Sequence, residues 1–172
     1  IGVKQGRIIT NRAVMNHDAP GVSKLSVLER YGHSSNPANG YTIGFGQLKG
    51  AIASSVGHDS HNLIVVGSNT EDMSTALNAL ITSGGGFCVV QSGNVIASLD
   101  LPFGGLMSPA SPKEIENKLV ELHKASAAIG CALPEPFLQL AFLSLPVIPS
   151  LKLTDKGLVD VDLFKIISVS AA

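Results

Sequence analysis

The sequence lacks tryptophan and is poor in charged residues, which make up 15% of its 172 residues. Soluble domains carry about 25% charged residues, so this chain is unusually apolar. Disorder is excluded, because disordered chains are polar and charged whereas 45% of this chain is hydrophobic. So little charge also indicates that another domain or subunit covers part of the exterior.

No charge of one sign dominates, since 12 basic residues stand against 13 acidic ones and no dense basic run occurs. A nucleic-acid partner is therefore not expected. The longest stretch that is nearly free of charge, residues 125–151, is interrupted by Glu135 and four prolines. It does not predict a membrane span. The sequence thus predicts a soluble globular protein without a membrane partner.

The two cysteines, Cys88 and Cys131, lack the spacing of a disulfide framework. They predict buried thiols in a cytoplasmic protein, and neither has the electropositive surroundings of a nucleophile. The chain starts at Ile1 rather than at Met, without the charged and apolar order of a signal peptide. We therefore expect a processed chain or a piece of a longer polypeptide.

The length predicts one domain over residues 1–172. Alternating patterns and short apolar runs predict strands at residues 4–10, 24–30, 41–46, 51–56, 63–67, 87–91, 94–99 and 158–169. Because helices are also expected, the predicted fold class is α/β or α+β, with a mixed β-sheet and helices packed on it.

The clearest predicted helix spans residues 69–83. Ser68, just before this helix, and Glu71, in its first turn, have the spacing of a capping box. Gly84 follows the last residue as a stop signal. The residues of its apolar stripe recur at helical spacing and are Met73, Ala76, Leu77, Leu80 and Ile81. This face is expected to pack on the sheet.

Two further helices are predicted downstream. The first begins at Ser111 with a second capping box completed by Glu114. Its apolar stripe consists of Ile115, Leu119, Leu122 and Ile129. A short apolar helix is expected at residues 137–145.

Residues 44–50 form a glycine cluster that does not match a nucleotide-binding motif. The dinucleotide fingerprint needs a glycine where Lys49 stands and a helix after it, whereas a strand follows here. No P-loop and no G-x-S-x-G motif of serine hydrolases occurs. The cluster therefore predicts a tight turn between strands. The Glu29–Arg30 pair at a strand end predicts a solvated ion pair.

The highest density of reactive groups is "HDSHN", residues 58–62, between two apolar strands. His58, Asp59 and His61 can titrate, or share a metal such as zinc, iron or manganese. The structural alternative is a polar turn in which Asp59 and Asn62 bind backbone amides. Loops between buried strands are favoured places for functional sites, and both interpretations stay open.

Several segments together resemble the C-terminal domain of the adenine deaminases, members of the metal-dependent amidohydrolase superfamily. The matching strings are "VLER" (27–30), "GFGQLKGAIASSVGHDSHNLIVVG" (44–67), "SNTEDM" (68–73), "LPFGGLMS" (101–108) and "PFLQLAFLSLPVIPSLKLTDKGLVDV" (136–161). Their order and spacing make the match specific over about residues 27–161. The chain departs from the family at Tyr31, where the family tends to have histidine, and over the polar segment 32–40.

The resemblance implies hydrolytic deamination of adenine to hypoxanthine and ammonia, in purine salvage. It also implies a divalent metal, manganese or iron with zinc as a further alternative, held in a (β/α)8 barrel by an H-x-H pair and other ligands. This chain has no H-x-H, and it is too short for a barrel of about 250 residues. The barrel is therefore expected N-terminal to Ile1 in the same polypeptide, and no metal site is assigned to this chain.

The resemblance further implies that this domain packs on the barrel and lends the HDSHN loop to the active site. The low share of charge also predicts a homo-oligomer. His58, Asp59 and His61 are then expected in supporting catalytic roles, and Ser60 and Asn62 in binding adenine. The alternative is a non-catalytic binding or oligomerisation module. The excess of apolar residues agrees with either function.

Overall fold

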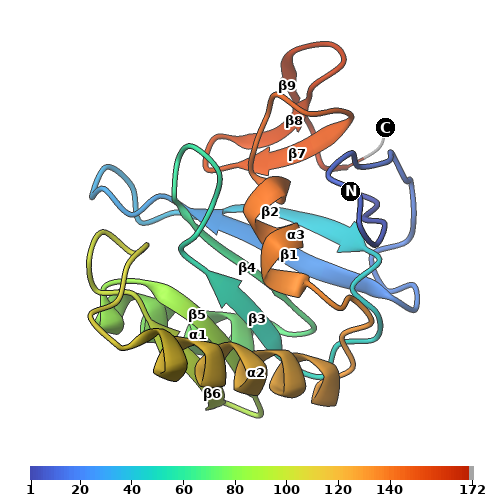
Figure 1. The fold of residues 1–172 in the computed structure, drawn as a ribbon. Helices are drawn as coiled ribbons and strands as arrows, with labels where there is room; N and C mark the ends of the chain where they lie inside the picture. The colour runs from blue at the N-terminus through green and yellow to red at the C-terminus, as the bar shows by residue number, and fades with distance from the viewer. Residues whose placement is uncertain (171–172) are drawn as a thin grey trace.

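The structure is a computed structural model that describes residues 1–170. It is an α+β fold in which helices lie on both faces of a β-sheet (Figure 1). The elements in chain order are β1 (Val22–Leu28), β2 (Ala38–Ile43), β3 (Ala51–Ser54), β4 (Leu63–Gly67), α1 (Thr70–Ser83), β5 (Gly86–Gln91), β6 (Asn94–Asp100), α2 (Pro112–Ala128), α3 (Pro136–Leu143), β7 (Leu151–Thr154), β8 (Gly157–Asp160) and β9 (Lys165–Ile167). The predicted class, a sheet with helices packed on it, is confirmed in its α+β form.

The main sheet has six strands in the order β2-β1-β4-β3-β5-β6, and all neighbouring strands are antiparallel. The pairing is therefore uniform rather than mixed. The reason lies in β3: α1 joins β4 to β5, which run in the same direction, but β3 lies between them and pairs with both. A second sheet, β7-β8-β9, packs against β2 at the top of Figure 1.

The sheet separates two apolar cores. On one face, Ala51 and Ala53 of β3 lie in a cluster with Leu80 of α1. On the other face, Ile52 lies in a larger cluster with residues of α2 and α3, among them Leu122. Successive side chains of a strand point to opposite faces, so β3 supplies both cores. The prediction that β3 and β4 are buried on both faces is confirmed.

The first predicted helix is present as α1, with two differences. Its N-cap is Asn69 rather than Ser68, because the Asn69 side chain accepts a hydrogen bond of 2.8 Å from the Asp72 backbone N–H. Ile81 is 57% exposed although it belongs to the predicted stripe, since the sheet covers a narrower face of the helix, centred on Met73, Ala76 and Leu80. Gly84 ends the helix in the left-handed conformation, as predicted.

The second and third helices are also confirmed. Ser111 and Glu114 form the predicted capping box of α2, and Leu122 and Ile129 of its stripe are buried. The third helix, α3, begins one residue earlier and ends two residues earlier than residues 137–145. It starts at a proline, which is common in the first turn of a helix.

The strand predicted at residues 41–46 is displaced: β2 spans Ala38–Ile43, and Gly44 follows it with a φ of 109°. Two further predicted strands are wrong or incomplete. Residues 4–10 form no strand: a turn with Gly6 at a φ of 67° interrupts them, and most of their side chains are exposed. The predicted tail strand divides into β8 and β9, because the Asp160 carboxylate accepts the Leu163 backbone N–H and turns the chain. Strand β7 was not predicted; it contains the buried Lys152, whose ammonium donates to the Ile8 carbonyl.

Both cysteines are free thiols, and the predicted burial is confirmed for Cys88, whereas Cys131 is only partly buried. Cys88 is buried in β5, and burial raises its pKa to about 12, so the reactive thiolate is strongly disfavoured at neutral pH. Burial also raises the pKa of Cys131. Within residues 1–170, each helix is too short or too polar to cross a membrane.

The packing of α1 can be tested by comparing two neighbouring apolar side chains. Leu80→Ala should lower the free energy of unfolding by about 2–5 kcal/mol, the usual cost of truncating a buried leucine. Ile81→Ala removes a similar side chain from the exposed side of the same helix turn and should change it little. Urea denaturation measures both, and equal effects would contradict the assigned face.

Candidate functional site

Three connections leave the main sheet at the same end. The register pairs Leu28 with Leu63, Ser54 with Phe87, and Gly86 with Asp100, so the loops after β1, β3 and β6 emerge side by side. We call residues 29–37, 55–62 and 101–107 the three-loop edge; it lies at the left of Figure 1. The glycine cluster at 44–50 joins β2 to β3 at the opposite end of the sheet.

The HDSHN loop is a tight turn between β3 and β4. Asp59 and His61 have positive φ values of 66° and 49°, which side chains other than glycine seldom adopt. The His61 backbone N–H donates to the Gly57 carbonyl over 3.3 Å, and the His58 N–H donates to Ala141 of α3 over 2.9 Å. The loop is therefore fixed both to itself and to the helix beside it.

His58 and Asp59 project from this loop into solvent. Their side chains are 54% and 74% exposed, and the His58 Nδ1 lies 3.3 Å from the nearer Asp59 carboxylate oxygen. The imidazole ring stacks on Phe142 of α3, with ring centroids 5.7 Å apart. An accessible imidazole beside a carboxylate can exchange a proton with a ligand or hold a polar ligand by hydrogen bonds.

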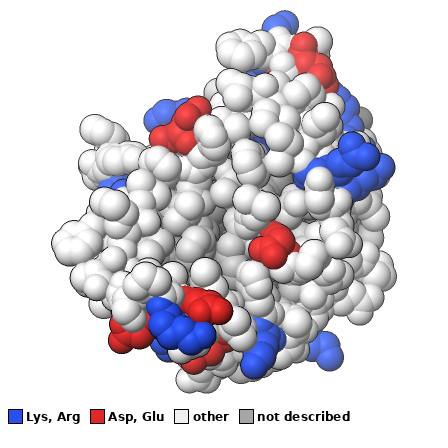
Figure 2. Space-filling model, viewed as in Figure 1, with Lys and Arg blue, Asp and Glu red and all other residues white. Residues whose placement is uncertain are grey.

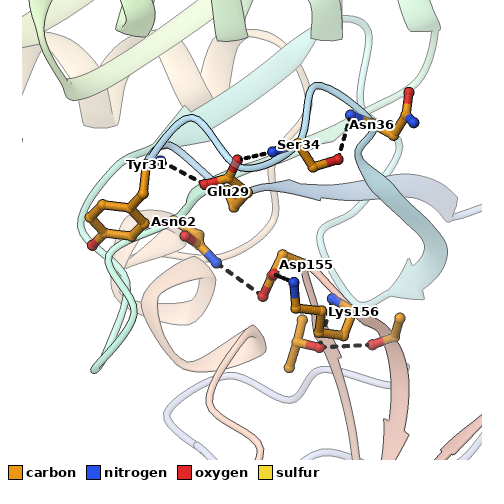
Figure 3. Close-up of polar contacts among 9 residues, drawn as sticks. Glu29, Tyr31, Ser34, Asn36, Asn62, Asp155 and Lys156 are labelled. Atoms are coloured by element: carbon orange, nitrogen blue, oxygen red, sulfur yellow. Dashed lines mark hydrogen bonds and ion pairs between the residues drawn. The ribbon is translucent and has the colours of Figure 1, made fainter.

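Asn62 and Ser60 are placed differently. The Asn62 side chain is buried and donates to the Asp155 carboxylate over 3.2 Å, which ties the loop to the β7–β8 turn (Figure 3). The Ser60 carbonyl accepts a hydrogen bond of 2.6 Å from the Tyr31 hydroxyl. Within the described residues, His61 Nδ1 and Asn62 Oδ1 are buried without a hydrogen-bond partner. The contacts of Ser60 and Asn62 to adenine stay a prediction.

Glu29 and Arg30 were predicted to form a solvated ion pair. Their side chains instead form hydrogen bonds to other residues of the three-loop edge. The buried Glu29 carboxylate accepts the backbone N–H groups of Tyr31, over 2.6 Å, and of Ser34 (Figure 3). These hydrogen bonds, that of Ser34 foremost, lower the pKa of Glu29. The Arg30 guanidinium donates to the Gly104 carbonyl and lies over the Tyr31 ring. The only sequence signal for this role is the "VLER" string of the resemblance.

Ser55 connects the third loop to the sheet. Its hydroxyl donates to the Gly105 carbonyl over 2.7 Å and accepts the Gly86 N–H over 2.7 Å. Gly105 has a φ of 72°, and a side chain there would collide with the Arg30 guanidinium. The positive φ favours glycine at this position, and the arginine would have to move to admit a larger residue. The hydrogen bonds of Ser55, Arg30 and Tyr31 join the three loops into one connected structure.

A hollow of about 630 Å³ adjoins the HDSHN loop. One wall contains His58, Asp59 and Ser144, and the opposite wall comes from the small sheet and its approaches, with Val147 and Ile166. Ser144 is buried at the end of α3, and its hydroxyl has no hydrogen-bond partner within residues 1–170. The exposed pair of the loop thus lies at the rim of a largely apolar concavity.

The described side chains do not provide a set of ligands for a metal ion. Within residues 1–170, no group of three or more His, Cys, Asp or Glu side chains is placed to bind a metal ion. His58 and Asp59 lie together, but within residues 1–170 no third ligating side chain, His61 included, joins them in such a group, so these residues do not form the shared site considered from sequence. The divalent metal implied by the resemblance finds no ligand set in this part of the chain.

Fold and edge together define a single α+β domain that presents polar loops at one end of an antiparallel sheet. The chain belongs to the adenine deaminase C-terminal domain family, whose sequence model matches residues 4–165. The predicted resemblance is thereby confirmed, over a longer part of the chain than the quoted strings cover.

Curated relatives agree with this family. The chain is 52% identical over 174 residues to a protein of Shewanella halifaxensis named adenine deaminase, with 98% of this chain and 30% of that protein covered. It is 50% identical over 177 residues to the adenine deaminase of Sinorhizobium fredii, with 97% and 31% covered. The chain therefore spans about a third of the length of these relatives.

The role of Glu29 in the edge predicts an acid-dependent stability. Because its folded pKa lies below the ordinary value of 4.5, the ionised carboxylate stabilises the fold above that value, and the contribution is lost as the pH falls through the lower folded pKa. Glu29→Gln should therefore flatten the loss of unfolding free energy between about pH 5 and pH 3. Urea denaturation across this range measures it, with Glu116→Gln on exposed α2 as control. Identical pH profiles for wild type and Glu29→Gln would contradict this role.

Proposed function

We propose that this chain acts as the C-terminal domain of an adenine deaminase polypeptide, which hydrolyses adenine to hypoxanthine and ammonia in purine salvage. The observation that supports this is the family match over residues 4–165, together with the curated relatives of that name. The reaction replaces the exocyclic amine of the purine by oxygen from water. It needs groups that position the ring and move protons.

Within that reaction, the HDSHN loop supplies positioning and proton-handling groups. The exposed His58–Asp59 pair can accept and donate hydrogen bonds at the purine edge or orient water. The His61 backbone N–H and the Asn62 side chain hold the turn that carries this pair, together with the Ser60–Tyr31 contact. In this proposal the His61 side chain, whose Nδ1 is buried without a hydrogen-bond partner within residues 1–170, has a supporting catalytic role beside them. The loop lies between buried strands, which restrict its movement as a functional site requires.

The divalent metal, manganese or iron with zinc as the alternative, belongs in this proposal to the preceding amidohydrolase barrel of the same polypeptide. Bound there, a divalent metal would supply the activation of water that attack on the ring carbon bearing the amine requires. This chain then contributes a surface and a loop rather than metal ligands. We also propose a homo-oligomer, because so apolar a domain needs extensive covered surface. A cytoplasmic location is proposed because both cysteines are free thiols.

A second candidate function is a non-catalytic binding or oligomerisation module. The exposed apolar side chains of the domain, Phe103 and Met107 among them, favour it. In that case the HDSHN loop is a structural turn, for which the Asn62–Asp155 contact already provides one role.

Histidine variants of the full-length enzyme separate these functions. His58→Ala and His61→Ala should each lower kcat/KM for adenine by on the order of 10²-fold, the scale of losing a positioning or acid–base group. His17→Ala is the matched control, because His17 is also an exposed histidine paired with a neighbouring aspartate, Asp18, but lies away from the edge. Normal turnover with large losses of stability in the two loop variants would assign the loop a structural role only.

The chain of 172 residues should not deaminate adenine by itself. No metal-ligand group occurs within residues 1–170, and activated water at neutral pH depends on such a metal in this proposal. Ammonia release from adenine, assayed after addition of manganese, iron or zinc, measures this. Steady turnover well above the uncatalysed rate would overturn the division of roles between this domain and the barrel.

A further inference from the structure

We propose that the three-loop edge is a preassembled docking surface for the preceding part of the same polypeptide, with Phe103 and Met107 as its apolar anchors. The inference rests on the proposed function, which assigns only the HDSHN loop to the active site. It adds the 101–107 loop as the main contact and the residues after β1 as the connection between the two loops.

The surface is preassembled because hydrogen bonds join its loops within this chain. Tyr31 donates to the Ser60 carbonyl, Arg30 to the Gly104 carbonyl, and Ser55 to the Gly105 carbonyl. All three loops are thus linked by direct contacts, and each starts from a strand of the same sheet. A surface that is ordered before binding loses little conformational entropy when its partner docks.

The 101–107 loop presents apolar side chains where water would otherwise meet them. Phe103 is 55% exposed and Met107 is 65% exposed. They face each other across a turn closed by the Phe103 N–H, which donates to the Met107 carbonyl over 3.1 Å. Tyr31 beside them is also exposed. Phe, Met, Tyr and Arg are the residues enriched in the centres of protein interfaces.

The charge of the surface indicates the chemistry of the partner. Residues 101–110 contain no charged side chain. Figure 2 shows charges gathered below, along α2, where lysine–glutamate pairs occur, and a further red and blue group at the upper left. The uncharged 101–107 loop, the main contact in this proposal, fits an apolar partner that is held permanently rather than one steered by charge.

The preceding part of the polypeptide fits this description. The chain spans 30% and 31% of two curated relatives, and its family is that of a C-terminal domain. A tethered partner is present at a high effective concentration and needs no charge to attract it. Docking at Phe103 would also bring the partner to His58 and Asp59, because the hydrogen bonds of Ser55 and Tyr31 hold the loops together.

Methionine oxidation in the full-length polypeptide tests this docking with internal controls. The chain has three methionines: Met107, 65% exposed; Met15, 50% exposed; and Met73, 5% exposed, on the face of α1 that packs on the sheet. Oxidation rate follows exposure, so in an undocked domain Met107 should react as fast as Met15 and far faster than Met73. If the surface is docked, Met107 is protected, and its oxidation rate should lie within about threefold of that of Met73. Mass spectrometry of peptides after dilute peroxide measures the rates, and denatured protein should show three similar ones.

A second measurement identifies the occupant. Phe103→Asp places a charge in the proposed contact and should raise the Met107 oxidation rate at least about fivefold at unchanged oligomeric state. Ile81→Asp, at an exposed apolar position on α1, should leave the rate unchanged. Met107 oxidising as fast as Met15 in the wild type would overturn the proposal, as would dissociation of the oligomer by Phe103→Asp, which assigns the surface to a second copy. Neither outcome depends on adenine turnover, so docking and the catalytic role of His58 and His61 can fail separately.

Discussion

The antiparallel pairing of β3 with both β4 and β5 is the constraint on which the rest of the molecule depends. This short strand lies between the two strands that α1 connects, and it sends side chains into both cores. Ser55 follows the end of β3 and lies close to both the start of β5 and the 101–107 loop. Its hydroxyl can therefore accept a hydrogen bond from Gly86 and donate one to Gly105. The polar edge is therefore positioned by the hydrogen bonds of a buried strand. A loop held only by its own contacts would be less well placed.

The three-loop edge contains buried polar side chains that hold its structure and exposed ones that a ligand can reach. Glu29 and Asn62 are buried, and each uses its side chain to hold a neighbouring segment, whereas His58 and Asp59 stay accessible. A buried polar atom without a partner costs about 1–3 kcal/mol, so most such atoms in folded proteins are paired. The exceptions within residues 1–170 belong to Arg30, His61, Asn62 and Ser144. All four lie in or beside this edge, and a cluster of local conflicts of this kind is characteristic of functional regions.

Local signals in the sequence were sufficient for the parts of the fold that depend on local chemistry. The capping box at Ser111, the glycine stop at Gly84 and the apolar run of β4 each predict their element correctly. Burial of Glu29 could not be predicted in this way, because it requires the loop after β1 to fold over the carboxylate. The sequence located the HDSHN loop as a candidate site. Which side chains face outward is decided by tertiary contacts, such as Asn62 with Asp155 and His58 with Phe142.

The low charge of the chain and the absence of a metal-ligand group within residues 1–170 have a common physical explanation if its surface is completed by the rest of the polypeptide. A domain that supplies position rather than metal chemistry needs a rigid connection between the surface that docks and the groups that face the substrate. Here that connection is short: Phe103 lies in the loop held by Ser55 and Arg30, and Arg30 lies over Tyr31, which holds the turn of His58. Misplacing a catalytic group by about 1 Å can cost about 10²-fold in rate. On the proposed function, the hydrogen bonds among the three loops therefore matter to catalysis as much as the titratable side chains that they position.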